Sequence, residues 1–197
     1  MKIFLIGYRA SGKSTVGLLL SKSLNLPFAD IDHAIESAAG MTIKELIARQ
    51  GWDAFRKKET ETIARLRDAH SCVVATGGGA VLSEANRTML KEMGKMIYLK
   101  TPLDRIVERL EQDAGGKATR PQFTSENLAA ETIAVLAQRI PLYESVADFT
   151  VDTAGKSIIQ VNNDIYQLLL EAGIVADIEK IRKQQRQKEI GGGGNGG

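Results

Sequence analysis

The sequence predicts an α/β fold of the three-layer α/β/α type, with a parallel sheet of five strands between two layers of helices. Segments with helical periodicity lie between short apolar or β-branched runs, and this alternation is typical of parallel sheets. A glycine-rich loop follows the first run, as in folds that bind ligands at the carboxyl ends of their strands. The expected strands cover residues 2–6, 27–31, 72–76, 96–100 and 148–152.

The composition indicates a globular chain of one main domain. The protein has 197 residues, of which 43% are hydrophobic, and a formal charge of +2. Residues 177–190 carry that net charge, so the remainder is neutral and offers no general field for nucleic acid. The chain has no signal-peptide pattern and no apolar run near the roughly eighteen residues of a membrane span. These features predict a cytoplasmic protein without nucleic-acid or membrane partners.

The single cysteine and the two histidines give no sign of a metal or redox site. Cys72 lies in an apolar run and is expected to be an inert strand residue. His33 and His70 have no partners at metal-ligand spacing. We expect both histidines on helix surfaces and no structural zinc.

Three apolar stripes at helical spacing are expected to face the core. The members of these stripes are Ile43, Leu46 and Ile47; Ile133, Leu136, Ala137 and Ile140; and Ile158, Ile165, Leu168 and Leu169.

The stretch GYRASGKST, residues 7–15, has the spacing of a phosphate-binding P-loop between a strand and a helix. In this pattern, backbone N–H groups and a helix N-terminus surround phosphate oxygens. Lys13 reaches the outer phosphates, and the hydroxyl of Ser14 binds Mg²⁺. An ordinary turn is the alternative, but the strand before the loop and the apolar periodicity after it favour a nucleoside triphosphate site.

Two carboxylates, Asp30 and Asp32, end the second expected strand. Their spacing of two places both on the same side of an extended chain, at the sheet edge that carries the P-loop. One can hold Mg²⁺ and the other can meet an acceptor hydroxyl. Asp32 also stands before an expected helix, so an N-cap is the alternative for it.

Three glycines and two arginines form a second candidate group. Residues 77–79, all glycine, follow the third expected strand and allow close backbone approach to an anion or a hydroxylated ligand. A flexible turn is the alternative. Arg56 and Arg139 lie on expected helices, and two guanidinium groups facing one cleft would clamp a carboxylate. Each arginine by itself is more typical of a surface residue.

Two segments depart from regular structure. Residues 113–124 contain adjacent glycines and a proline, and predict a mobile lid that carries Lys117 and Arg120. Beyond residue 173 we expect a tail, residues 174–197. It begins with a short amphipathic helix at Ile174 and continues through a polar basic run, which indicates a solvated helix face rather than an RNA site, to a flexible glycine-rich end.

Together these motifs resemble the shikimate kinase family across residues 1–172. The resemblance implies a P-loop fold of the nucleoside-monophosphate-kinase type, with a single kinase domain over residues 1–173. It also implies a substrate-binding segment at about residues 32–62 and a lid at about 113–124, and it favours a monomer. The motifs that carry it, in order, are GYRASGKST, DID, GMTIKELIARQGWDAFRKKE, ATGGGAV, ATRP and QRIPLYESVAD.

The resemblance implies transfer of the γ-phosphoryl group of ATP to the 3-hydroxyl of shikimate, with Mg²⁺ arriving with the nucleotide. Lys13, Asp32 and Arg120 would be catalytic, with Arg120 over the transferring group and Asp32 at the acceptor hydroxyls. Ser14 and Asp30 would hold the metal. The residues implied at the ATP phosphates are Gly7, Ala10, Ser11, Gly12, Lys13, Ser14, Thr15 and Arg120, and those implied at shikimate are Asp32, Arg56, Gly77, Gly78, Gly79 and Arg139.

The chain departs from the family pattern at a few positions. Ala10 stands where the family commonly has glycine, and Gln112 and Asp113 stand where an arginine often packs on adenine. Two alternatives stay open. One is a kinase of the same fold for another hydroxy acid such as gluconate, and the other is a module that binds nucleotide or ligand without turnover.

Overall fold

The structure, a computed structural model, describes residues 1–114 and 128–191. Its centre is a five-stranded sheet in the order β2-β3-β1-β4-β5, and all neighbouring strands are parallel. This confirms the predicted fold class. The strands are β1 (Lys2–Ile6), β2 (Phe28–Asp30), β3 (Val73–Ala75), β4 (Gly94–Lys100) and β5 (Phe149–Asp152).

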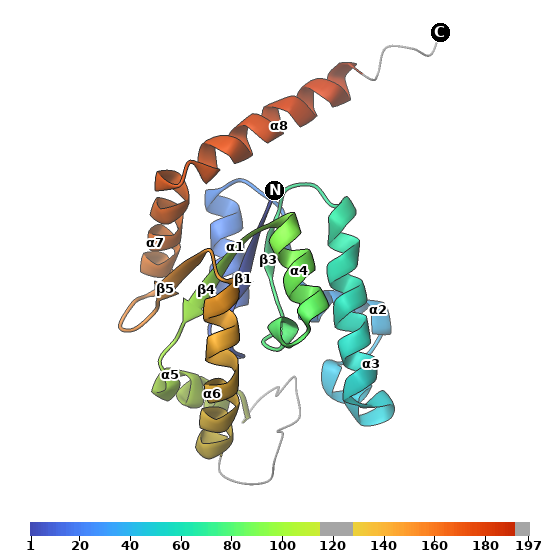
Figure 1. The fold of residues 1–197 in the computed structure, drawn as a ribbon, viewed down its shortest axis with the longest axis vertical. Coiled ribbons are helices and arrows are strands. Elements are labelled where there is room, and N and C mark those ends of the chain that lie inside the picture. The colour runs from blue at the N-terminus through green and yellow to red at the C-terminus, as the bar shows by residue number, and fades with distance from the viewer. Residues whose placement is uncertain (115–127, 192–197) are drawn as a thin grey trace.

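Helices cover both faces of the sheet (Figure 1). The described residues form eight α-helices and two short 3₁₀ helices, η1 (Leu66–Asp68) and η2 (Ala80–Leu82). The α-helices are α1 (Lys13–Ser23), α2 (Ile31–Ala39), α3 (Ile43–Arg65), α4 (Glu84–Met93), α5 (Leu103–Ala114), α6 (Leu128–Val146), α7 (Ile158–Glu171) and α8 (Ile174–Gly191).

Alternation along β1 divides the interior into two cores. Phe4 and Ile6 point into a core shared with α2, α3, α4 and α6. Ile3 and Leu5 point to the other face, into a core shared with α1, α7 and the start of α8. Because all four side chains are fully buried, β1 is the central strand around which both layers assemble.

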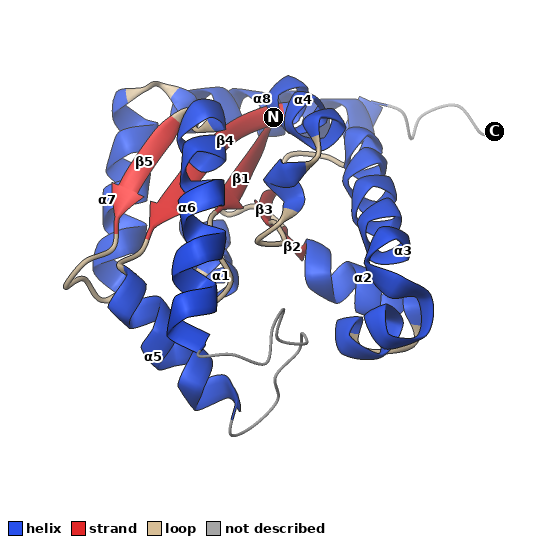
Figure 2. Cartoon of the chain, turned by 60° about the horizontal axis from the view of Figure 1, so that its bottom comes forward, coloured by secondary structure: helices blue, strands red, loops and turns tan. Residues whose placement is uncertain are grey.

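The second strand is shorter than the sequence predicted. β2 ends at Asp30, and α2 begins at the next residue (Figure 2). Asp30, rather than Asp32, is the N-cap of that helix: its Oδ1 atom accepts hydrogen bonds from the backbone N–H groups of Asp32 and His33, at 3.0 and 3.2 Å. An aspartate that caps a helix stops the strand, since its side chain satisfies the first free N–H groups.

Two of the predicted core stripes are only partly correct. Ile133 on α6 and Ile158 on α7 are exposed, whereas Leu136 and Leu169 are buried. Ala137 is also exposed. The inward face of α6 is rotated relative to the prediction because polar side chains, described below, occupy part of it. The first stripe, on α3, is fully buried as predicted.

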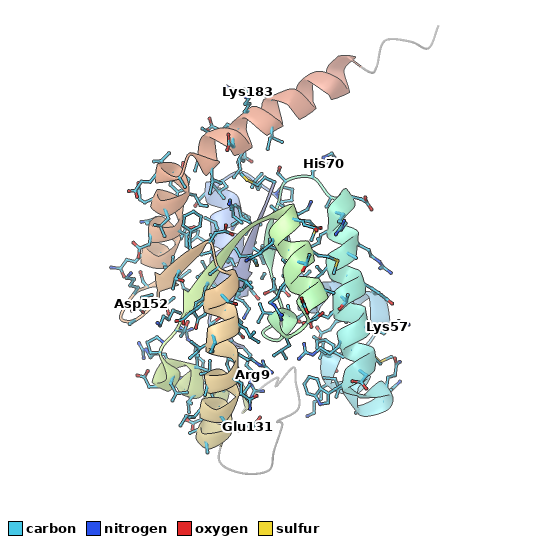
Figure 3. All side chains as sticks on the ribbon, viewed as in Figure 1. Arg9, Lys57, His70, Glu131, Asp152 and Lys183 are labelled. Atoms are coloured by element: carbon cyan, nitrogen blue, oxygen red, sulfur yellow. The ribbon has the colours of Figure 1, made fainter. Side chains whose placement is uncertain are left out.

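The structure shows the positions of the single cysteine and the two histidines. Cys72 is buried, and its burial raises the pKa of the thiol. His33 is exposed on α2, but His70 lies in the loop between η1 and β3 and not on a helix. Figure 3 shows His70 at the surface, at the end of the molecule opposite Arg9.

The tail differs from the expectation of a short helix. One continuous helix, α8, includes the whole polar run, whose Lys, Arg, Gln and Glu residues are strong helix formers. Ile174, Val175 and Ile178 at its start are buried in the core against α1 and α7. The helix then extends away from the body of the protein (Figure 1). The predicted glycine-rich end lies outside the described residues from 192 onward.

None of the helices in the described part of the chain is long and apolar enough to cross a membrane.

The packing of α8 predicts that its first turns stabilise the fold. Ile178 is 1% exposed, so Ile178→Ala should lower the free energy of unfolding by about 2–4 kcal/mol through lost burial and the cavity that remains. Urea denaturation measures this change. Leu170→Ala, at a position 48% exposed, is the control and should cost less than about 1 kcal/mol. Equal effects of the two substitutions would contradict the packing of α8.

Candidate functional site

The P-loop lies between β1 and α1 and has the backbone that a phosphate site needs. Gly7 and Gly12 have φ values of 146° and 92°, which residues with a Cβ rarely adopt. Gly12 is the N-cap of α1 and has no side chain to cap it. The first N–H groups of α1 are therefore oriented toward the loop, where an anion can accept their hydrogen bonds.

Lys13 is buried inside the loop. Its Nζ atom donates a hydrogen bond to the carbonyl of Tyr8 at 2.6 Å and approaches Ser11 Oγ at 3.4 Å. Only 8% of the residue is exposed. The loop thus orders the ammonium group on the same concave backbone that surrounds the phosphate position.

Two further contacts hold the loop from neighbouring elements. Thr101, just after β4, donates its hydroxyl hydrogen to the carbonyl of Ser11 at 3.3 Å. Arg109 on α5 donates from Nη1 to the carbonyl of Ala10 at 2.9 Å. Ala10 itself has φ 59°, a left-handed conformation that is strained for alanine. Ala10 was noted from the sequence as a departure from the family's usual glycine, whereas Arg109, which lies in no recognised motif, was not predicted.

Ser14 and Asp30 face each other across the loop. Ser14 Oγ donates to Asp30 Oδ2 at 2.5 Å, while Oδ1 of the same carboxylate caps α2. A hydroxyl and a carboxylate oxygen are the hard ligands that Mg²⁺ takes, and protein sites for this ion use one or two such groups beside phosphate oxygens. The pair therefore fits the predicted metal ligands. No cluster of three or more His, Cys, Asp or Glu side chains with metal-site geometry occurs among the described residues.

Asp32 reaches the site from a helix rather than from a strand. It occupies the first turn of α2, two residues after Asp30, and is partly buried. The spacing argument for an extended chain was therefore wrong in its geometry. The carboxylates of Asp30 and Asp32 instead belong to the N-terminus of one helix, where the helix dipole favours negative charge.

The glycine turn at residues 77–79 joins β3 to η2 and is fully buried. An added Cβ on Gly78 would lie 2.9 Å from the backbone nitrogen of Arg9 in the P-loop. An added Cβ on Gly79 would overlap the guanidinium of Arg56. At position 78 a side chain would collide with backbone, and at position 79 it would displace the Arg56 guanidinium, so glycine permits this close packing of the turn.

Arg56 and Arg139 both lie beside this glycine turn. Arg56 on α3 pairs with Glu59 at 2.6 Å and lies near the rings of Trp52 and Phe55. Arg139 on α6 donates from Nη1 to the carbonyl of Gly78 at 3.2 Å. Burial lowers the pKa of Arg139, and the charge of Arg56 contributes in the same direction, which places the two cations in one region.

Several residues of this group carried no recognised signal in the sequence. Tyr8 in the P-loop has the guanidinium carbons of Arg9 and Arg139 at 5.8 and 5.6 Å from its ring centre. Glu131 Oε1 lies 3.8 Å from Arg9 Nη2, and Figure 3 labels both residues near the lower end of α6. Glu59 could have been found, because it stands three residues after Arg56 on the same helix face.

Residues 115–124 of the predicted lid, Arg120 among them, lie outside the described residues, whereas positions 113 and 114 form the end of α5 rather than a loop. The other predicted site residues come from the loops and helices that follow β1, β2 and β3, together with α3 and α6. These residues converge at the carboxyl ends of the parallel strands, which is the edge at which open α/β sheets bind ligands.

Comparison with known proteins identifies the family. A family model for shikimate kinase matches residues 9–170. The chain belongs to the shikimate kinase family. Its members are ATP-dependent kinases, so the family supplies ATP as co-substrate. The geometry above is therefore that of a kinase, and the family resemblance inferred from the motifs is confirmed.

Individual relatives agree with the family model. The chain is 38% identical over 171 residues to a shikimate kinase of Syntrophus aciditrophicus, which covers 83% of this chain and 88% of the relative. It is 43% identical over 152 residues to shikimate kinase 2 of an Enterobacter species, covering 77% and 86%. Among solved structures, shikimate kinase from Acinetobacter baumannii in complex with shikimate matches with a TM-score of 0.81 and 35% identity, covering 87% and 93%.

The strained backbone at Ala10 gives a stability prediction. Ala10→Gly should raise the free energy of unfolding by up to about 1 kcal/mol, because relief of the left-handed strain exceeds the entropy that glycine adds to the unfolded chain. Thermal and urea unfolding measure it. Ala34→Gly, on the exposed face of α2, is the control and should lower stability by about 1 kcal/mol. If Ala10→Gly lowered the free energy of unfolding as much as Ala34→Gly does, the backbone at Ala10 would not be strained.

Proposed function

We propose that this protein transfers the γ-phosphoryl group of ATP to the 3-hydroxyl of shikimate, giving shikimate 3-phosphate and ADP. One observation carries the proposal beyond a generic P-loop kinase. Two arginines on separate helices, Arg56 and Arg139, lie beside a buried glycine turn that packs on the P-loop itself. A small carboxylic acid held there would present its hydroxyls next to the bound phosphates.

The acid is bound by charge and by close backbone approach. Guanidinium groups bind carboxylates bidentately, and their attraction is strong where water is largely excluded. Arg139 is 8% exposed, and a carboxylate beside it would offset the repulsion from Arg56. Residues 77–79 allow the ring of the acid to approach the backbone. Asp32, at the start of α2, binds the ring hydroxyls and orients or deprotonates the attacking one.

Phosphoryl transfer forms a bond from the 3-hydroxyl oxygen to the γ-phosphorus and breaks the bond from that phosphorus to the ADP oxygen. Lys13 and the N–H groups of the P-loop stabilise the charge that develops on the phosphoryl oxygens. Ser14 and Asp30 would hold Mg²⁺, which supplies neutralisation of phosphate charge when bound. We assign the same charge-stabilising role to Arg120. Ordered groups of this kind position the reactants and perform little covalent chemistry.

We propose that the protein acts in the cytoplasm as a monomer on small-molecule substrates, with residues 1–173 as the kinase domain. Size-exclusion chromatography with light scattering tests the oligomeric state.

The activity is tested by ADP release from purified protein with Mg²⁺ and ATP, in the presence of shikimate, of gluconate or of no acceptor. Release with shikimate alone is the expected result. Release with gluconate would indicate another hydroxy acid as substrate. Nucleotide binding with no acceptor-dependent release would indicate a binding module and contradict the proposal.

Arg139 is predicted to act on the acid and not on the nucleotide. Arg139→Ala should raise the KM for shikimate by about 10²-fold or more and leave the KM for ATP within about threefold, because it removes a buried bidentate partner of the carboxylate. Steady-state kinetics with each substrate varied in turn measure both constants. Arg105→Ala, at an exposed position on α5, is the control. Unchanged saturation by shikimate would remove Arg139 from the site.

Lys13 is predicted to act on turnover. Lys13→Ala should lower kcat by at least about 10²-fold, since the buried ammonium no longer stabilises charge on the transferring group. The measurement is kcat at saturating ATP and shikimate, with circular dichroism to confirm folding. Lys22→Ala, on the exposed face at the end of α1, should behave as the wild type. Normal turnover by the Lys13 variant would contradict the P-loop assignment.

A further inference from the structure

We propose that Tyr143 is a positioning residue for the acid substrate, whose hydroxyl fixes the Gly78 carbonyl so that Arg139 and Arg56 meet the carboxylate in one arrangement. This inference rests on the proposed function, because it assigns the acid to these two arginines. Tyr143 lies within the stretch QRIPLYESVAD, but no role was predicted for it from the sequence.

The Gly78 carbonyl accepts hydrogen bonds from two side chains of the same helix. Tyr143 donates its hydroxyl hydrogen to this oxygen at 2.5 Å, and Arg139 donates from Nη1 at 3.2 Å. The two donors are four residues apart on α6 and therefore lie on one face of the helix, one turn apart. The tyrosine contact is the shorter of the two, so the hydroxyl is the closer restraint on the turn.

Core packing alone does not explain why residue 143 carries a hydroxyl. Tyr143 is fully buried in the core beneath the sheet and stacks on Tyr98 of β4, with ring centres 5.0 Å apart. Phenylalanine would fill the same volume without the cost of removing a hydroxyl from water. Burial also raises the pKa of Tyr143, so the group keeps its proton and remains a donor throughout the working pH range.

The position of the turn determines the space around both arginines. Gly79 leaves no room for a side chain beside Arg56, and Gly78 packs against the backbone nitrogen of Arg9. Without the tyrosine hydroxyl, the buried Gly78 oxygen would depend more heavily on Arg139, because an unsatisfied buried carbonyl is costly. The substrate carboxylate and this carbonyl would then compete for one guanidinium group.

Tyr143→Phe tests the inference because it removes the hydroxyl and keeps the ring. We expect the KM for shikimate to rise about five- to tenfold, with kcat and the KM for ATP each within about twofold of the wild type. Tyr98→Phe is the matched control. It removes a hydroxyl from the stacked ring, which is also buried but makes no hydrogen bond to the turn, and should leave all three constants near wild-type values.

A second readout separates positioning from a general loosening of the site. Shikimate is compared with its carboxamide analogue, tested as acceptor and as competitive inhibitor. If Tyr143 acts through the arginine pair, Tyr143→Phe should weaken shikimate binding about five- to tenfold but change binding of the neutral amide by less than about twofold. Likewise, Tyr143→Phe added to Arg139→Ala should raise the KM for shikimate no further. Equal losses for acid and amide, or fully additive losses in the double variant, would overturn the inference.

Different results would contradict the proposed function and the positioning role of Tyr143. No shikimate-dependent ADP release by the wild-type protein would overturn the proposed function, and this inference with it. Turnover by the wild type combined with an unchanged KM for shikimate in Tyr143→Phe would overturn the positioning role alone. Thermal unfolding of each variant shows that the compared proteins are folded.

Discussion

The parallel pairing of β1 with β3 is the constraint on which the site depends. Leu5 pairs with Ala75, and both the N–H and the hydroxyl of Thr76 bond to the carbonyl of Leu5. The two strands therefore end together, and the loops that follow them emerge side by side. One loop is the P-loop, for which we propose phosphate binding, and the other is the glycine turn, which we propose the acceptor approaches, so in this proposal the fold itself sets the distance between nucleotide and acceptor. The close approach of Gly78 to Arg9 is the direct result.

The second requirement of the site is to keep several cations close together before any ligand binds. Buried acids and aromatic faces provide this: Glu59 pairs with Arg56, and Glu131 pairs with Arg9. Tyr8 lies near two guanidinium groups. Breaking a buried pair leaves an uncompensated charge, so these partners also hold the arginines in place. In the proposed function, bound anions would add further partners for these cations.

Much of the fold and part of the site could be predicted from the sequence. The order of strands and helices follows from hydrophobic periodicity, and the P-loop follows from a spacing whose chemistry is local. Asp30 shows the limit of that reasoning. The pattern DID singled out two carboxylates and placed both on a strand, because the prediction used the period of extended chain. The N-cap competition, in which Asp30 ends the strand, was assigned to the neighbouring aspartate.

The sequence by itself determined the chemistry of residues 7–15 and the α/β class, because backbone conformation within one loop and burial along one strand are local properties. Only the tertiary structure decided which face of α6 turns inward. Periodicity favoured Ile133 and Ala137, yet Arg139 and Tyr143 face the interior, since their partner is a carbonyl 61 and 65 residues away in the chain. A polar residue is stable in a core only where it finds a hydrogen-bond partner. The sequence pattern of one helix does not show whether another part of the chain supplies that partner.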